Sequence, residues 1–244
     1  MPHLRVLYED NHIIAVHKPA GMLVEPAQPV KAGRSGRPDA SGHGPESHRR
    51  GDPSLFEEVK KYLKDKYKKP GNVFLGIVHR LDRPVEGIVL FGKTSKGAAR
   101  LSEQFREHTI RKIYHAVVLG HPEPPKATLI HFLTKDERSK VAIVFETSAP
   151  GRDKAELMYE TVRSNDNYSL LKIKLKTGRF HQIRAQLGSI GHPIAGDVKY
   201  GAPESLPDKT IALAATEIEF QKAAADELVE LHIEMPAPWR KLVA

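Results

Sequence analysis

The stretch His79-Arg80-Leu81-Asp82-Arg83 places one carboxylate between two guanidinium groups, just before a proline. Alternation along an extended segment sends Arg80 and Asp82 to one side and Leu81 to the other. An ionised carboxylate in such a position can act as a general base or as a nucleophile. The same pattern also occurs in structural ion pairs, and the stretch taken singly is better explained as one.

A second cluster of reactive side chains covers residues 176–184, KTGRFHQIR, and begins where a strand is expected to end and a helix to start. On that helix His181 and Arg184 are three residues apart and therefore share one face. The apolar stripe of the same helix consists of Ile183, Leu187 and Ile190. Taken singly, this cluster is better explained as a capped helix than as a reactive site.

Residues 87–94 fit the pattern G-x-x-x-x-G-K-[ST] of phosphate-binding loops. Such a loop must curl so that its backbone N–H groups point at phosphate oxygens. Here the four intervening residues are bulky and apolar, Ile88 to Phe91, which predicts a buried strand. Pro84 also interrupts the strand that should precede the loop. We therefore expect no nucleoside triphosphate site.

The composition excludes several classes of protein. Without cysteine, the chain has neither disulfides nor thiolate sites, and its 13 histidines form no H-E-x-x-H motif, so we expect no metal site. No G-x-S-x-G elbow of a serine hydrolase is present. No apolar run approaches the roughly 18 residues of a membrane helix, and the first residues lack the layout of a signal peptide. We expect a cytoplasmic protein with no membrane partner.

The chain carries 38 Lys and Arg against 30 Asp and Glu, a formal net charge of +8 over 244 residues. This balance favours polyanionic partners, nucleic acid first, because each phosphate contact releases counterions. A merely basic, soluble surface explains it equally well. Residues 27–53 contain five Gly and four Pro with a single branched aliphatic residue, which predicts a flexible surface insertion.

The remaining chain alternates short strands with few helices, which predicts an α+β fold on a largely antiparallel mixed sheet with a few flanking helices. We expect a single domain over residues 1–244. A capping box at 54–57 opens the first helix, which ends at Pro70-Gly71, and Ser95 is the expected N-cap of the second. The third helix is expected at 178–190. Strands are expected at 4–8, 12–16, 73–78, 88–91, 112–119, 128–133, 141–146, 155–162, 170–175, 211–220 and 228–235.

Taken together, the clusters resemble the RluA-type family of RNA pseudouridine synthases. In chain order, the segments that carry the resemblance are YEDNHIIAVHKPAGM (8–22), HRLDR (79–83) with the strand that follows it, RKIY (111–114), TGRFHQIR (177–184) and GHPIAGDVKYG (191–201). They span nearly the whole chain in one order. No S4-like RNA-binding domain is expected before this core, and the insertion at 27–53 has no counterpart in the family pattern.

The resemblance implies a pseudouridine synthase-like fold that isomerises uridine within RNA, ribosomal or transfer, without cofactor, metal or nucleoside triphosphate. By alignment with the family, Asp82 is the catalytic carboxylate, which either traps C1′ or removes the C2′ proton. Arg184 would keep Asp82 ionised, Tyr114 would stack on the uracil, and Arg80 would fill the gap left by a flipped nucleotide. The other RNA-binding residues implied by the resemblance are Arg83, Arg179, His181 and Gln182.

The chain departs from the family pattern at Val85-Glu86, where members commonly carry Thr-Ser or a close variant. A carboxylate at Glu86 would repel RNA phosphate if it faced the cleft. Two functions of different class therefore remain: a monomeric synthase, and a non-catalytic RNA-binding module that retains the fold.

Overall fold

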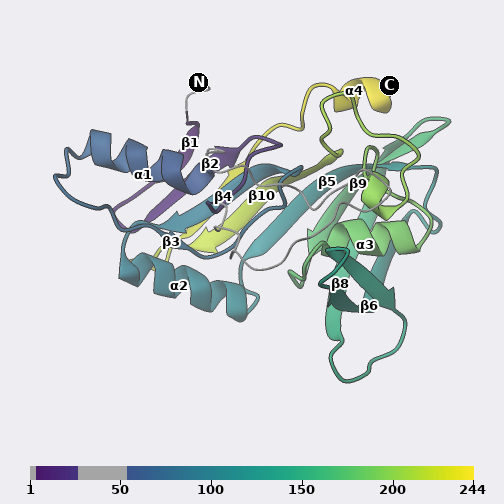
Figure 1. Ribbon diagram of the computed structural model, residues 1–244, viewed down its shortest axis with the longest axis horizontal. Coiled ribbons are helices and arrows are strands. Elements are labelled where there is room, and N and C mark those ends of the chain that lie inside the picture. The colour runs from purple at the N-terminus through teal and green to yellow at the C-terminus, as the bar shows by residue number, and fades with distance from the viewer. Residues whose placement is uncertain (1–3, 27–53) are drawn as a thin grey trace.

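The computed structural model describes residues 4–26 and 54–244, and within them one large sheet of eleven strands crosses the molecule (Figure 1). Strands on the main path are ordered β1-β2-β4-β10-β5-β9-β8-β6-β7, with β11 on β10 and β3 on β4. The strands are β1 (Val6–Glu9), β2 (Ile13–Lys18), β3 (Gly76–Ile77), β4 (Glu86–Gly92), β5 (Arg111–Leu119), β6 (Lys126–Asp136), β7 (Val141–Phe145), β8 (Asp153–Ser164), β9 (Tyr168–Leu175), β10 (Leu213–Gln221) and β11 (Leu228–His232).

The sheet is mixed, as expected, because β4 and β10 run parallel while the other described pairs are antiparallel. Gly87 makes that parallel pairing possible. Its φ is +143°, and a Cβ built on it would lie 2.5 Å from the carbonyl oxygen of Ala215. Only glycine accepts both that conformation and that approach. This close pairing fixes the start of β4, which directly follows the Asp82 segment, against β10 at the centre of the sheet.

The helices are α1 (Leu55–Lys66), α2 (Ser95–Arg106), α3 (Gln182–Ser189) and α4 (Trp239–Leu242), with a 3₁₀ turn, η1, at Val198–Tyr200. In α1 the expected capping box is present: the Ser54 hydroxyl accepts from the backbone of Glu57, whose carboxylate accepts from the Ser54 N–H. In α2 the N-cap is Thr94, one residue before the expected Ser95, because the Thr94 hydroxyl accepts from the Gly97 N–H.

The third helix also begins later than predicted. His181 lies at φ +50°, which a continuous helix from residue 178 would not allow. The side-chain oxygen of Gln182 accepts from the Arg179 N–H and the Thr177 hydroxyl, so it organises residues 177–182 as a loop. This loop turns His181 and Arg184 towards the same place, which a longer regular helix would not do.

Two apolar clusters lie on opposite sides of β2 and β4. Val16, Val89 and Phe91 pack with α1 on one side, while Ala15, Ile88 and Leu90 pack with Leu101 of α2 on the other. Figure 1 shows α1 and α2 flanking one half of the sheet and α3 against the other half. Residues 88–91 form a buried strand, which confirms the prediction on which the phosphate-loop interpretation was rejected.

The predicted strands are present with shifted ends, except that the expected 73–78 is reduced to the two residues of β3. The expectation of a flexible insertion at 27–53 lies outside the described residues. In the part of the chain that is described, no helix is long and apolar enough to cross a membrane. No group of three or more potential metal-ligating side chains occurs in that part either.

Candidate active site

Asp82 lies in a turn directly before β4, and the side chain of Lys18 makes hydrogen bonds to the backbone of this turn. The Lys18 ammonium is fully buried and donates to the backbone carbonyls of Pro19, Arg83 and Val85. Burial lowers the pKa of Lys18 to about 7, although the negative charges of Asp82 and Glu86 raise it. A buried cation with three carbonyl acceptors fixes the backbone on both sides of the turn.

Arg184 of α3 connects Asp82 to a second carboxylate. Its Nε and Nη2 donate to the two oxygens of Asp197 at 2.7 and 2.8 Å, and its Nη1 donates to Oδ2 of Asp82 at 3.1 Å. The Arg184 and Asp197 side chains are 6% and 1% exposed, whereas Asp82 is 27% exposed. Since the bidentate pair fixes the guanidinium plane, Arg184 presents its third donor rigidly to a carboxylate that solvent can still reach.

His181 approaches Asp82 from the loop before α3. Its Nε2 lies 3.6 Å from Oδ2 of Asp82, and its Nδ1 lies 2.7 Å from the Tyr200 hydroxyl. That hydroxyl accepts from the Ala142 N–H, so we assign its proton to the bond with Nδ1 and the imidazole proton to Nε2. Burial and the charge of Arg184 lower the pKa of His181 to about 2. A neutral imidazole therefore directs an N–H towards Asp82.

Tyr114 lies on β5 at the centre of the sheet. It is paired with Ala215 of β10, which is in turn paired with Gly87 of β4. Two strand spacings of about 4.8 Å each therefore separate Tyr114 from the segment that follows Asp82. Its ring is 9% exposed, and burial together with the charge of Asp82 raises its pKa. Tyr114 is thus a neutral phenol beside the carboxylate.

The other expected RNA-binding residues lie around this centre in different roles. The Arg80 side chain is 69% exposed, and its Nη1 lies 3.6 Å from a carboxylate oxygen of Glu25 in a surface ion pair. The Arg83 side chain donates to the Gly21 carbonyl, and Arg179 donates to the Lys154 carbonyl while lying 3.7 Å from Asp153. Gln182 is buried and organises the loop described above. His181 and Arg184 therefore lie at Asp82, and Arg80 is exposed. The side chains of Arg83, Arg179 and Gln182 make hydrogen bonds to backbone groups.

The unusual Glu86 is paired with His17, whose Nε2 lies 2.9 Å from its carboxylate. His17 lies two positions from Ala15, and Glu86 lies two positions from Ile88. Ala15 and Ile88 pack with Leu101 of α2, and side chains two positions apart in a strand share a face, so His17 and Glu86 point to the α2 side of the sheet. Lys18, which holds the Asp82 turn, points to the other side. Glu86 therefore does not add its charge to the face on which Arg184 meets Asp82.

Sequence reasoning assigned no role to Lys18, Asp197 or Tyr200. Each stands in a segment that had been singled out for its resemblance, HKPAG or GHPIAGDVKYG. A buried Asp among apolar residues, as in Ile194-Ala195-Gly196-Asp197, is a signal that a cationic partner is required.

Comparison with known proteins shows the family to which this chain belongs. The family model described as "RNA pseudouridylate synthase" matches residues 12–189. This protein belongs to the RNA pseudouridylate synthase family. It is an RNA pseudouridine synthase, an isomerase, and RNA is its partner.

Among its curated relatives is the "Ribosomal large subunit pseudouridine synthase D" of Zymomonas mobilis subsp. mobilis, which is 32% identical over 96% of this synthase and 69% of the relative. The "tRNA pseudouridine synthase C" of Haemophilus ducreyi is 34% identical over 81% and 74%. The "Dual-specificity RNA pseudouridine synthase RluA" of Escherichia coli O6:H1 is 33% identical over 84% and 80%. These relatives support the RluA-type assignment.

Solved structures confirm the fold. "Human RNA Pseudouridylate Synthase Domain Containing 4" superposes with a TM-score of 0.73 at 19% identity, covering 97% of this synthase and 90% of that chain. "Human RNA Pseudouridylate Synthase Domain Containing 1" gives a TM-score of 0.70 at the same identity, over 99% and 86%. The predicted sheet-dominated α+β fold of the pseudouridine synthase type is therefore confirmed.

Proposed function

We propose that this synthase isomerises uridines of ribosomal or transfer RNA, with Asp82 as the catalytic carboxylate. The observation that carries the proposal is the Arg184 guanidinium, which is locked on Asp197 and donates its remaining Nη1 to Asp82. A cation fixed beside a solvent-accessible carboxylate holds that group at a defined position, from which it can react. Relatives named for ribosomal RNA, transfer RNA and both support this choice of substrates.

The reaction breaks the bond between N1 of uracil and C1′ of ribose, turns the base, and joins C5 to C1′. The proton lost from C5 is balanced by the proton gained at N1, so no other reagent is consumed. Asp82 either attacks C1′ and holds the sugar as an ester until the base has turned, or removes the C2′ proton. Both routes need the carboxylate at a fixed position, which Arg184 and the Lys18-held turn provide.

The remaining side chains handle the base and the RNA. The buried phenol of Tyr114 offers a flat surface against which a uracil can stack and turn. A paired uridine must leave its helix to reach Asp82, and the exposed Arg80 is long enough to occupy the space it vacates. The Nε2–H of His181 orients Asp82 or a uracil oxygen. Arg83, Arg179 and Gln182 shape the rim of this site.

We further propose that the synthase acts as a cytoplasmic monomer of one catalytic domain, without metal, cofactor or nucleoside triphosphate. The chemistry above is redox-neutral and requires no phosphoryl transfer. The motif at 87–94 cannot serve as a phosphate loop because its residues form the buried strand β4. Mg²⁺ is then needed only to fold the RNA.

Incubation of the purified synthase with separate ribosomal and transfer RNA transcripts tests the proposal. Mass spectrometry of the digested RNA should reveal pseudouridine at a small number of positions, in the absence of nucleoside triphosphates. A synthase that binds these transcripts tightly but leaves every uridine unchanged would instead be the non-catalytic RNA-binding module. Pseudouridine confined to another class of RNA would overturn the substrate assignment.

A further inference from the structure

The C-terminal end of α1 and the turn after it carry a concentration of positive charge far from Asp82. Residues 60–69 contain six lysines and one acid, Asp65. Because Leu55, Val59 and Leu63 face the core, the lysines project outwards. We call this surface the α1 basic end; its lysines are Lys60, Lys61, Lys64, Lys66, Lys68 and Lys69. One or two cations here would stabilise the helix dipole, but six exceed that need.

Most of these lysines are not used in ion pairs. Within residues 4–26 and 54–244, Lys66 pairs with Glu9, while Lys61, Lys64 and Lys68 have no acidic partner within ion-pair distance. Elsewhere, Lys172 pairs with Glu217 and Lys176 with Glu156. The α1 basic end is therefore a local excess of uncompensated charge, which attracts a polyanion.

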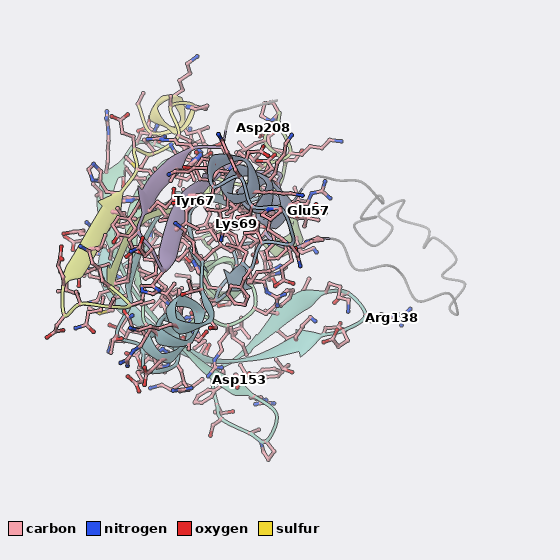
Figure 2. All side chains as sticks on the ribbon, turned by 90° about the vertical axis from the view of Figure 1, so that its left-hand side faces the viewer. Glu57, Tyr67, Lys69, Arg138, Asp153 and Asp208 are labelled. Carbon is pink, nitrogen blue, oxygen red and sulfur yellow. The ribbon has the colours of Figure 1, made fainter. Side chains whose placement is uncertain are left out.

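An exposed aromatic ring lies within this surface. Tyr67 is 46% exposed. The Tyr67 ring has the ammonium groups of Lys66, Lys69 and Lys93 within 4.8 to 5.9 Å of its centre. Figure 2 shows Tyr67 and Lys69 together at this end of the molecule. Basic groups interleaved with exposed aromatic rings are typical of surfaces that bind single-stranded nucleic acid through phosphates and base faces.

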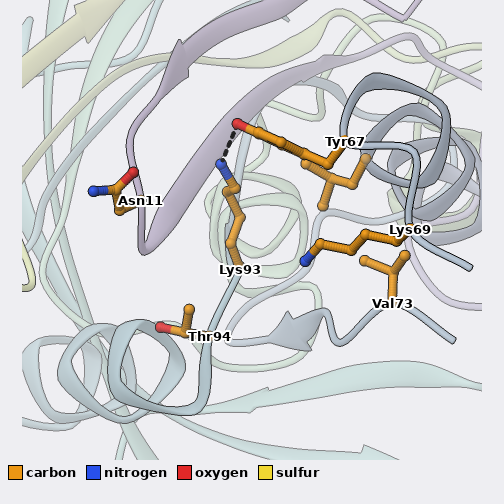
Figure 3. Close-up of a pocket in the computed structure, with 7 residues that line it drawn as sticks. Asn11, Tyr67, Lys69, Val73, Lys93 and Thr94 are labelled. Atoms are coloured by element: carbon orange, nitrogen blue, oxygen red, sulfur yellow. Dashed lines mark hydrogen bonds between the residues drawn. The ribbon is translucent and has the colours of Figure 1, made fainter. Parts of the chain in front are cut away.

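The surface is also hollowed. A cavity of about 150 Å³ is lined by Tyr67, Lys69, Lys93 and Thr94, among others. Figure 3 shows the Lys69 ammonium extending into it, opposite Lys93, whose ammonium donates to the Tyr67 hydroxyl. A neighbouring hollow of about 280 Å³ is lined by Lys60, Lys61, Lys64, Gly71, Asn72 and Val73. Both recesses are rimmed by lysine ammonium groups.

The α1 basic end and the active site belong to the same side of the sheet. Leu81 and Val85, which flank Asp82, pack in the same apolar cluster as Leu55, Val59 and Leu63 of α1. Strand β4 begins beside Asp82 and ends beside Lys93, and its seven residues span about 20 Å. One RNA can therefore reach both places without crossing the sheet.

We infer that the α1 basic end binds the sugar-phosphate backbone of the substrate RNA about 20 Å from the reacting uridine. This inference rests on the proposed function, since it assigns the surface to the same RNA. The surface increases the affinity of the synthase for its RNA and favours RNAs that extend beyond the target loop. It takes no part in bond breaking, because none of its side chains reaches Asp82.

The test compares the triple variant Lys61→Gln, Lys64→Gln, Lys69→Gln with a matched variant, Lys126→Gln, Lys174→Gln, Lys241→Gln. Both remove three exposed positive charges, the second set from other parts of the surface. Two RNAs are used: a uridine-containing stem-loop, and the same stem-loop with single-stranded extensions at both ends. Dissociation constants are measured across a salt series, and single-turnover rates at saturating RNA.

For the extended RNA we expect the α1 variant to bind about tenfold more weakly at about 0.1 M salt, with a log–log salt slope smaller by about two. Its affinity for the short stem-loop and its single-turnover rate should equal those of the wild type. The matched variant should lose less than about twofold on either RNA. Equal losses in the two variants, or an unchanged affinity for the extended RNA, would overturn the inference.

Two further outcomes distinguish a failure of this inference from a failure of the proposed function, and RNA binding from membrane binding. If the wild type forms no pseudouridine but the α1 variant alone loses RNA affinity, the proposed function fails while the surface assignment stands. Binding to phosphatidylserine vesicles is measured in parallel. If the α1 variant loses that binding and keeps full affinity for the extended RNA, the surface serves a membrane and the inference is wrong.

Discussion

The two ends of β4 use charge in opposite ways. At its beginning, Asp82, Arg184 and Asp197 form a network with fixed geometry, in which Arg184 and Asp197 are almost fully buried. At its end, the α1 basic end presents lysines on long, largely exposed side chains, and Glu9 pairs with Lys66 among them. Burial strengthens each interaction in the first region, whereas solvent and salt screen the second. The network at the beginning of β4 therefore depends on the positions of single atoms, whereas the α1 basic end acts through its summed charge.

The sharpest test of the first region is Asp82→Asn, which should reduce pseudouridine formation to background. RNA affinity should remain nearly unchanged, because the substitution removes the reacting group but no phosphate contact. Single-turnover assays and binding isotherms on one transcript measure both quantities. Glu86→Gln is the control, since it neutralises a nearby carboxylate that faces the other side of the sheet. An active Asn variant would exclude Asp82 as the catalytic carboxylate.

Arg184→Met should reduce both rate and stability. The substitution keeps much of the side-chain volume but leaves Asp197 buried without its partner, at a cost of about 3–5 kcal/mol in the free energy of unfolding. Urea unfolding measures that cost.

The double variant Arg184→Met, Asp197→Asn removes the stranded charge, so it should recover stability while its single-turnover rate stays low. Recovery of the rate together with the stability would show that Arg184 acts only as a structural partner of Asp197.

Lys18→Met should lower the rate about tenfold, because the carbonyls of Arg83 and Val85 lose their common donor and the Asp82 turn loosens. Stability should respond to pH in a defined direction. The pKa of Lys18 falls from about 10.5 in the unfolded chain to about 7 in the folded protein, chiefly through burial. Between those values the unfolded chain binds more protons, so burying Lys18 becomes less costly as pH rises.

Unfolding free energies of the wild type and Lys18→Met, measured from pH 6 to about pH 10.5, test this sign. The wild type should gain stability relative to the variant across that interval. A difference that stays constant with pH would mean that the folded protein does not depress the Lys18 pKa.

The smallest effect is expected at the anchor of the α1 basic end. Glu9 accepts from Tyr62 and Lys66 through one oxygen and from Tyr67 and Lys93 through the other. Burial opposes ionisation, but these donors prevail and lower the pKa of Glu9 from 4.5 to about 2. Glu9→Gln should therefore cost about 2 kcal/mol of stability at neutral pH and leave the rate unchanged.

Because the pKa of Glu9 is lowered on folding, its contribution is complete above about pH 4.5 and is lost as pH falls towards 2. Urea unfolding of both proteins across this range should show their stabilities converging. A loss of catalytic rate in Glu9→Gln would show that the two ends of β4 are coupled.

Local patterns predicted most elements of this synthase correctly. The capping box at Ser54 and Glu57 marked the start of α1, and the apolar run at 88–91 marked β4. The ends of elements were less predictable where side chains decided them. Thr94 rather than Ser95 caps α2, and Gln182 diverts the chain into a loop before α3, because each makes a hydrogen bond that its neighbours do not.

The sequence by itself predicted which groups carry the chemistry, since Asp82 and Arg184 were named from motif order across the chain. Tertiary structure alone decided how they are held. Arg184 lies 102 positions from Asp82 in the chain, and Lys18 reaches carbonyls 65 and 67 positions away. No local propensity encodes such pairs. They follow from the pairing of β4 with β2 and β10, and from the need to partner every charge that folding buries.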